Sequence, residues 1–94
     1  MERTFYLLTY DIADAKRLAK VARAMEAIGE RVQDSVFEAY LTPAELDKVL
    51  ARMEKLMVMK EDSLRVYSLC AGCRSRIRTL GVGRVTQPPG LMIV

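Results

Sequence analysis

Residues 4–10 read TFYLLTY, and Asp11 follows them directly. Every residue in this stretch is β-branched, aromatic or leucine, and no polar face alternates with an apolar one. This composition is typical of a strand that is buried on both sides. We therefore predict a central β-strand over residues 4–10 that ends at an acidic residue.

A helix is predicted from Ala13 to Glu30, because apolar residues recur there at helical spacing and Gly29 supplies a stop signal. Basic residues occupy its first half, so we expect Asp11 to lie beneath those basic turns. Capping is the alternative role for Asp11, but Asp14 is equally well placed to cap this helix.

A second helix is predicted to begin after Thr42. Thr42 and Glu45 form a capping-box pattern, and Pro43 occupies the first helical position. Leucine, valine and methionine then recur at helical spacing, which favours a buried stripe over a binding surface.

Further strands are predicted over residues 32–41, 64–70 and 74–80. Three arginines share one face of the last of these: Arg74, Arg76 and Arg78. Strand-helix-strand followed by helix-strand-strand indicates an α+β fold, and we predict a ferredoxin-like βαββαβ sandwich with both helices on one face of an antiparallel sheet.

We predict that residues 1–94 form one domain, which suits a chain of this length. Residues 85–94 form a C-terminal tail that ends in four apolar residues after a Pro-Pro-Gly bend. The tail could dock as an extra strand on its own sheet or on a partner's sheet. We favour the partner, and hence a homodimer.

The composition limits the partners and the kinds of catalysis that we expect. The formal charge of +3 is mild, and the basic excess lies in residues 60–94, with six basic and two acidic groups. With no signal-peptide pattern and no apolar stretch long enough to span a membrane, we expect a cytoplasmic protein without membrane contact. There is no histidine, so catalysis would rest on carboxylates, hydroxyls or a metal ion.

Cys70 and Cys73 form a single CxxC motif. One chain cannot build a four-ligand zinc site from two cysteines without histidine. A redox motif would normally precede a helix in a thioredoxin-like pattern, whereas this pair ends a predicted strand. We therefore expect two small buried or turn residues.

One carboxylate is too little to bind Mg²⁺ tightly, because that ion takes six oxygen ligands. In a twofold dimer whose axis passes near the ends of the first strands, two copies of Asp11 could share one ion. Such an ion would polarise a phosphodiester and activate water without histidine.

Two segments carry a family resemblance. Tyr10-Asp11-Ile12 before a basic helix, and the segment GERVQDSVFE at residues 29–38, resemble the Cas-two proteins of CRISPR systems. The first motif is short and frequent, and the second is quite specific. The resemblance extends over most of the chain.

The resemblance implies a ferredoxin-like homodimer that acts in spacer acquisition with the Cas-one integrase and cleaves RNA or DNA with a divalent metal such as Mg²⁺. By matching positions, Asp11 corresponds to the metal-binding catalytic acid, and Tyr10 is its catalytic neighbour. The nucleic-acid-binding residues that we predict are Arg17, Lys20, Arg31, Phe37, Arg74, Arg76 and Arg78. For Phe37 the alternative, a core aromatic, is favoured.

Three functions remain open from the sequence. The first is a metal-dependent endonuclease built on two copies of Asp11. The second is a non-catalytic dimeric adaptor that binds duplex DNA through its arginines and bridges the integrase subunits. The third is a small-molecule-sensing ferredoxin-like regulatory domain, for which the sequence offers no ligand motif.

Overall fold

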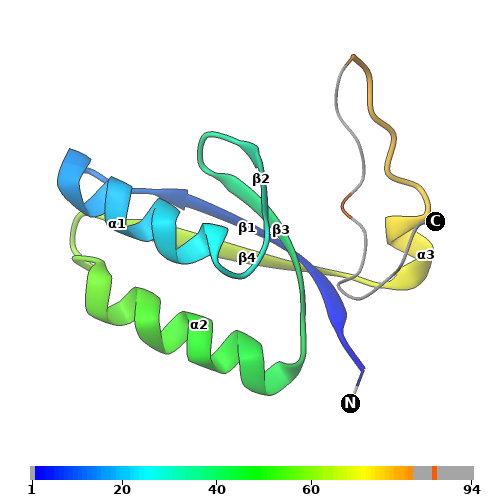
Figure 1. Ribbon diagram of the computed structural model, residues 1–94, viewed down its shortest axis with the longest axis horizontal. Helices are drawn as coiled ribbons and strands as arrows, with labels where there is room; N and C mark the ends of the chain where they lie inside the picture. The colour runs from blue at the N-terminus through cyan, green and yellow to red at the C-terminus, as the bar shows by residue number, and fades with distance from the viewer. Residues whose placement is uncertain (1, 82–85, 87–94) are drawn as a thin grey trace.

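The computed structural model describes residues 2–81 and 86 (Figure 1). The elements are, in chain order, β1 (Thr4–Asp11), α1 (Ala15–Glu26), β2 (Glu30–Gln33), β3 (Val36–Leu41), α2 (Pro43–Leu56), β4 (Ser63–Leu69) and the short α3 (Ala71–Arg74). None of the described helices has the length and apolar character needed to cross a bilayer.

The four strands form one sheet in the order β2-β3-β1-β4, and every neighbouring pair is antiparallel. β1 lies at the centre, as the unbroken apolar run of residues 4–10 predicts. α1 and α2 lie on the same side of this sheet (Figure 1). The order of strands and the placement of the helices confirm the α+β, ferredoxin-like fold.

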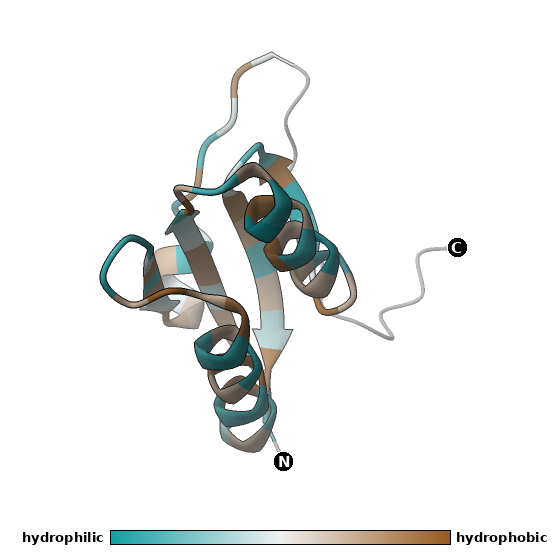
Figure 2. Ribbon diagram, turned by 90° about the vertical axis from the view of Figure 1, so that its left-hand side faces the viewer, coloured by the Kyte–Doolittle hydropathy of each residue, from teal (hydrophilic) through white to brown (hydrophobic). Residues whose placement is uncertain are grey.

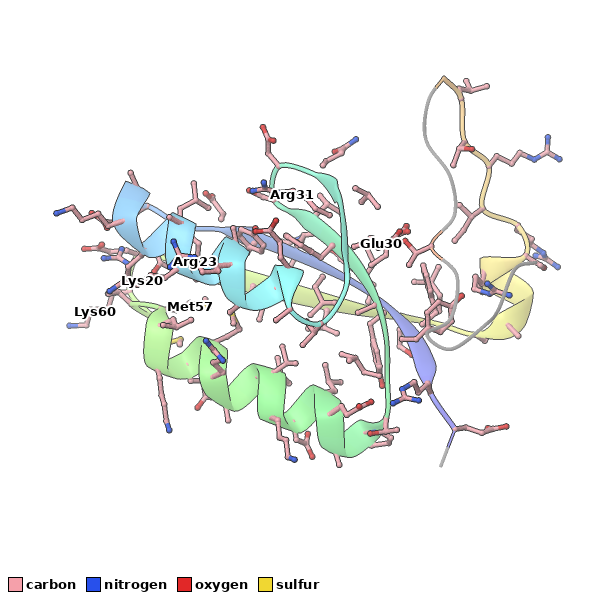
Figure 3. All side chains as sticks on the ribbon, in the orientation of Figure 1. Lys20, Arg23, Glu30, Arg31, Met57 and Lys60 are labelled. Carbon is pink, nitrogen blue, oxygen red and sulfur yellow. The ribbon has the colours of Figure 1, made fainter. Side chains whose placement is uncertain are left out.

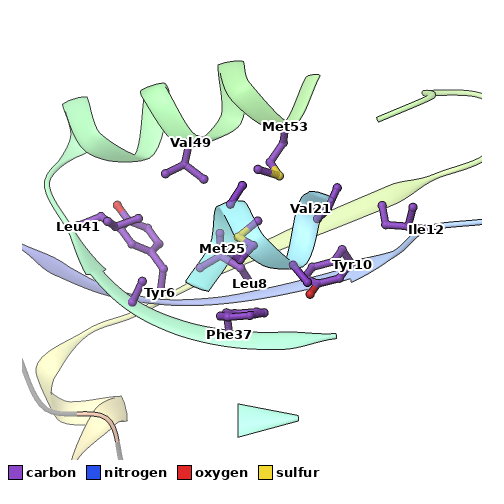
Figure 4. Close-up of a cluster of buried hydrophobic side chains, with 13 residues drawn as sticks. Tyr6, Leu8, Tyr10, Ile12, Val21, Met25, Phe37, Leu41, Val49 and Met53 are labelled. Atoms are coloured by element: carbon purple, nitrogen blue, oxygen red, sulfur yellow. The ribbon is translucent and has the colours of Figure 1, made fainter. Parts of the chain in front are cut away.

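The hydrophobic core lies between the sheet and the two long helices (Figure 4). Leu8 from β1 and Phe37 from β3 are fully buried. Val21 and Met25 from α1 pack against them, and α2 contributes Val49 and Met53 among others. Teal and brown alternate around both long helices, as expected of amphipathic helices with one face on a core (Figure 2).

Both long helices begin at a capping residue that the sequence predicts. The Asp14 carboxylate accepts a hydrogen bond from the Arg17 backbone N–H at 2.9 Å. Thr42 and Glu45 form the complete capping box, each side chain accepting from the other's backbone N–H. Because Asp14 is the cap of α1, Asp11 is not used for that purpose.

The predicted single strand over residues 32–41 is wrong. Residues 30–41 form a β-hairpin in which Asp34 and Ser35 make a two-residue turn between β2 and β3. Short polar residues of this kind favour turns because their side chains hydrogen-bond nearby backbone. The hairpin supplies the strand that a βαββαβ fold requires.

The predicted strand over residues 74–80 is also wrong. The chain turns instead into α3, which ends at Arg74, and no strand occurs between residues 75 and 81. The three arginines of this segment therefore do not share a strand face. A closed turn explains the difference, because the Arg74 and Ser75 backbone N–H groups donate to the Cys70 and Ala71 carbonyls.

The predicted tail strand over residues 85–94 lies outside the described residues except for Thr86. Thr86 is buried against the chain's own sheet, where its backbone N–H and its hydroxyl both donate to the Glu38 carboxylate. Its carbonyl accepts a hydrogen bond from the Tyr40 hydroxyl at 3.3 Å.

Candidate functional site

Asp11 and Tyr10 lie on opposite sides of the sheet. Tyr10 belongs to the core cluster beneath the helices. Asp11 pairs in register with Ser63 of β4, on the side that α1 and α2 leave uncovered. Our expectation that Asp11 lies beneath the basic turns of the first helix is therefore wrong, because successive side chains of a strand point to opposite faces.

Asp11 lines a shallow depression of about 280 Å³ on this helix-free face. The depression is lined by Thr9, Tyr10, Asp11, Ser63, Arg65 and Tyr67. Asp11 is exposed, and no donor in residues 2–81 or at residue 86 hydrogen-bonds its carboxylate. An exposed carboxylate without a protein partner is free to bind a ligand or a cation.

Arg65 is the cation of this depression. A hydrogen bond with Tyr67 raises the pKa of its guanidinium further above its usual value. Arg65 of β4 pairs in register with Thr9, two residues before Asp11 on β1, so Arg65 and Asp11 lie diagonally across neighbouring strands. The depression therefore holds one acidic and one basic group, which suits contact with a phosphate and its counterion.

Tyr10 is buried, and its ring stacks on Phe37 with the ring centroids 6.1 Å apart. Its hydroxyl donates to the Asp34 carbonyl at 3.4 Å. Burial raises the pKa of this hydroxyl above its usual value, although the nearby Arg31 acts in the opposite direction. Tyr10 thus anchors the β2–β3 turn, and its hydroxyl does not reach the helix-free face.

Arg17 is held by two acidic residues of the loop between α2 and β4. Its Nε donates to Asp62 at 2.9 Å, and a terminal nitrogen donates to Glu61 at 3.0 Å. The Asp62 side chain has no exposed surface and also accepts from the backbone N–H groups of Ala13 and Val58. Arg17 therefore has a structural role in addition to the phosphate contact that we predict.

The remaining predicted binders differ in accessibility. Lys20 projects from the exposed side of α1, near the same end of the molecule as Lys60 (Figure 3). Arg31 is exposed, donates to the Asp34 carbonyl at 3.1 Å and lies 5.8 Å from the centre of the Phe37 ring. Phe37 has no exposed surface and is the core aromatic of the alternative interpretation.

Arg74 is half-buried and donates to the Tyr40 hydroxyl, with its guanidinium 5.6 Å from the centre of the Tyr40 ring. Tyr40 in turn packs edge-on against Phe5. Arg76 and Arg78 are exposed. Of the three arginines, these two have side chains available for a phosphate backbone.

The residues do not complete a metal site within one chain. Across residues 2–81 and 86, no three acidic or cysteine side chains gather closely enough to hold an ion. Thr9, Ser63 and Tyr67 bring hydroxyl groups to the same depression as Asp11, but none of the described residues that line it supplies a second carboxylate. Mg²⁺ prefers one or two carboxylates with waters and phosphate oxygens, so a second acid must come from elsewhere.

Sequence reasoning missed Ser63, Arg65 and Tyr67 as neighbours of Asp11. The alternation along residues 64–70 does predict that Arg65 and Tyr67 share one face, and the structure confirms it. The pairing of β1 with β4 is a long-range contact, and no local sequence pattern predicts it. Asp62 was missed because an acidic residue in a loop is ordinarily solvated.

Comparison with known proteins decides the family. The pattern of the family described as CRISPR associated protein Cas2 matches residues 4–77. The chain belongs to the Cas2 family. The resemblance that the sequence indicates is confirmed.

Relatives of this Cas2-family chain include the "CRISPR-associated endoribonuclease Cas2 3" of Synechocystis sp., which is 38% identical over 89 residues, 95% of this chain and 97% of the relative. The crystal structure of Streptococcus pyogenes Cas2 is 39% identical with a TM-score of 0.74, covering 82% of this chain and 99% of that one. A chain of a "Partial Cas6-RT-Cas1–Cas2 complex" is 26% identical with a TM-score of 0.77, covering 97% and 99%.

Proposed function

We propose that this chain is an adaptation subunit that assembles with a Cas1 integrase as a homodimer and has metal-dependent endonuclease activity centred on Asp11. The observation that carries the proposal is the position of Asp11, which is exposed at the end of the central strand on the helix-free face. A cytoplasmic location is part of the proposal.

The names of similar proteins support both the proposed nuclease activity and the proposed assembly with Cas1. The Synechocystis relative is named an endoribonuclease, and the chain of similar structure belongs to a complex that contains Cas1. The uncovered sheet face supports a homodimer, because Tyr67 is 45% exposed there and no helix of residues 2–81 covers the depression beside it. A second copy placed against this face would bring a second Asp11 to the same side.

Two copies of Asp11, with the hydroxyls of Thr9 and Ser63 beside them, are the residues that would hold Mg²⁺. The bound ion supplies charge neutralisation on a phosphodiester and lowers the pKa of a coordinated water. Arg65 would bind a non-bridging phosphate oxygen and orient the backbone beside the carboxylates. Lys20, Arg76 and Arg78 would extend the contact with the nucleic acid away from this centre.

The test compares Asp11→Asn with Asp14→Asn, two neighbouring acids of which only the first lies at the proposed centre. Asparagine is also a good helix cap, so Asp14→Asn preserves α1. Each protein is incubated with labelled single-stranded RNA and duplex DNA, with Mg²⁺ or with a chelator. We expect cleavage only with Mg²⁺, retained by Asp14→Asn and lost by Asp11→Asn at unchanged thermal unfolding.

A second measurement does not depend on activity. Mn²⁺ binding, followed by electron paramagnetic resonance, should show one ion per two chains in the parent protein and none in Asp11→Asn. Equal cleavage by both variants would place the activity elsewhere or in a contaminant, and would overturn the role of Asp11.

A non-catalytic adaptor is the second candidate, and it is favoured by the single carboxylate, that of Asp11, which the described residues of one chain bring to this depression. An adaptor would bind duplex DNA through phosphates, with affinity that falls steeply as salt is raised and with little sequence preference. Asp11→Asn would then support spacer acquisition in cells as well as the parent does, whereas a double Arg76→Ala, Arg78→Ala variant would not.

A further inference from the structure

Cys70 and Cys73 are both exposed, and they lie at the point where β4 passes into α3. Of the two expected settings, buried or in a turn, the structure shows the turn: Cys70 caps α3 and Cys73 lies within it. The proposed nuclease and adaptor functions use neither residue. The two thiols are thus exposed, close in sequence and not assigned to either proposed function.

The two side chains face one another across a single turn. The Cys70 sulfur accepts a hydrogen bond from the Cys73 backbone N–H at 3.4 Å. The turn is closed by the Arg74 N–H, which donates to the Cys70 carbonyl at 2.9 Å, and by the Ser75 hydroxyl, which donates to the Gly72 carbonyl at 2.7 Å. Residues three apart on a helix have Cβ atoms roughly 5–6 Å apart, whereas a disulfide needs them about 3.5–4.5 Å apart, so side-chain rotation alone does not close the bond. Cys70 is the cap of α3 with an extended backbone, and both cysteines are exposed. A small movement of this short turn, together with rotation of the side chains, would bring the sulfurs into bonding range.

The surroundings of the two thiols differ. Cys70 opens into a cavity of about 380 Å³ that is also lined by Glu2, Arg3, Phe5, Tyr40 and Arg74. Two guanidinium groups and one carboxylate thus face it, and the Arg3 charge is partly balanced by Glu45 at 3.3 Å. Hydrogen bonds from Cys73, first of its backbone and then of its thiol, lower the pKa of Cys70, and donation to Cys70 raises the pKa of Cys73. The asymmetry makes Cys70 the better nucleophile of the pair.

We propose that Cys70 and Cys73 form a reversible dithiol–disulfide site that is oxidised by small anionic disulfides of the glutathione type, with Cys70 as the attacking thiolate. A cavity of this volume can admit part of such a molecule, and the two arginines offer charge complementarity to its carboxylates.

The exchange balances with the small disulfide as the oxidant. The Cys70 thiolate attacks one sulfur of the small disulfide, a Cys70–S–S bond forms, and the first small thiol leaves with the proton that Cys70 gave up. Cys73 then loses its proton and attacks the Cys70 sulfur, so that the second small thiol leaves with that proton. The protein has lost two hydrogens and two electrons, and the small disulfide has become two thiols.

The first experiment treats reduced protein with oxidised glutathione and follows free thiols and intact mass. We expect both thiols to disappear, the mass to fall by two hydrogens without a retained glutathione, and dithiothreitol to reverse the change. Retained glutathione as the final product, disulfide-linked dimers alone, or two persistent thiols would each overturn the proposal.

The second experiment separates the two cysteines. Serine replaces cysteine with little change of shape and is itself a good helix cap, so Cys70→Ser and Cys73→Ser should fold normally. We expect Cys73→Ser to trap a mixed disulfide on Cys70 quickly and Cys70→Ser to react slowly, with the difference vanishing in denaturant. Equal rates in the folded proteins would contradict the assignment of Cys70 as the nucleophile.

Discussion

Arg17 and Asp62 form an ion pair across 45 residues of sequence, with Arg17 Nε 2.9 Å from Asp62 Oδ2. The contact joins the first turn of α1 to the loop between α2 and β4. Because the Asp62 side chain is fully covered and also accepts two backbone N–H groups, it holds three segments together at the end of the sheet where Asp11 lies.

Asp62→Asn should lower thermal stability. The substitution keeps the shape of the side chain but leaves Arg17 and two backbone donors with a weaker partner. We expect the Tm to fall by about 5 °C or more. The matched control is Glu61→Gln, because Glu61 contacts the same guanidinium at 3.0 Å but is exposed, and its loss should change the Tm little. Equal effects of both substitutions in a thermal scan would contradict the special role of Asp62.

The same contact predicts a pH dependence of stability. Hydrogen bonds from Arg17 and from the Val58 and Ala13 N–H groups lower the pKa of Asp62 from 3.8 to about 2, against the effect of its burial. The stabilisation from Asp62 is complete at pH values above its pKa in the unfolded chain, and it is lost as the pH falls through its lower pKa in the folded protein. Chemical denaturation should therefore show the Asp62 contribution disappearing between pH 4 and about 2, and Asp62→Asn should lack that component.

Gly29→Ala should destabilise the fold. A Cβ at this position would overlap the Glu38 carbonyl oxygen and lie 2.9 Å from the Ala39 Cβ, so β3 would have to move. We expect a loss of about 1–3 kcal/mol in the free energy of unfolding.

Gly72→Ala is the matched control for this change, since its nearest neighbour would be the Cys70 sulfur at an ordinary 3.8 Å. We expect a change within about 0.5 kcal/mol. Similar losses in the two variants, measured by urea denaturation, would show that close packing is not the reason for glycine at position 29.

Thr42→Ala should remove the side-chain half of the capping box and cost about 1 kcal/mol of stability. Thr42→Ser retains the hydroxyl that accepts from the Glu45 N–H at 3.2 Å, and should restore most of the loss. Urea denaturation of the three proteins measures the difference. No gap between alanine and serine would mean that the cap contributes little in this chain.

Tyr10→Phe separates the two residues that the sequence motif places side by side. The Tyr10 hydroxyl donates a long hydrogen bond to the Asp34 carbonyl and interacts with Arg31, and it lies on the opposite side of the sheet from Asp11. We expect cleavage of RNA or DNA to change by less than about twofold, because the ring and its packing remain. A loss as complete as that of Asp11→Asn would show that the hydroxyl takes part in the chemistry.

Local signals in the sequence predicted much of the architecture. The unbroken apolar run of residues 4–10 correctly indicates a central strand, and Thr42 with Glu45 correctly marks the start of α2. The turn at Asp34 and Ser35 was missed because two polar residues also fit the exposed face of one longer strand. The segment after Cys70 was misassigned because alternating arginines resemble a strand, while the backbone hydrogen bonds that close α3 leave no pattern in the side chains.

The candidate site was predictable only in part. The sequence singles out Asp11 because it directly follows the apolar run and because Asp14 is equally well placed to cap the first helix; its role in the site stays a prediction. Arg65 and Tyr67 could not be assigned to it, because the pairing of β1 with β4 joins residues more than fifty positions apart. The contact between Arg17 and Asp62 was not predictable for the same reason, because the two residues are 45 positions apart in sequence. Arg17, which we predict to bind phosphate, therefore also has a structural partner.

The alternation of β1 has a consequence for how this chain can change over time. Substitutions at Tyr10 and at the other core residues of β1 affect folding, whereas substitutions at Thr9 and Asp11 affect what the helix-free surface binds. Effects on folding and effects on binding therefore fall on adjacent residues of one strand. A lineage could lose or remodel the chemistry at Asp11 while the core and the segment at residues 29–38, which carries the more specific part of the family resemblance, are preserved.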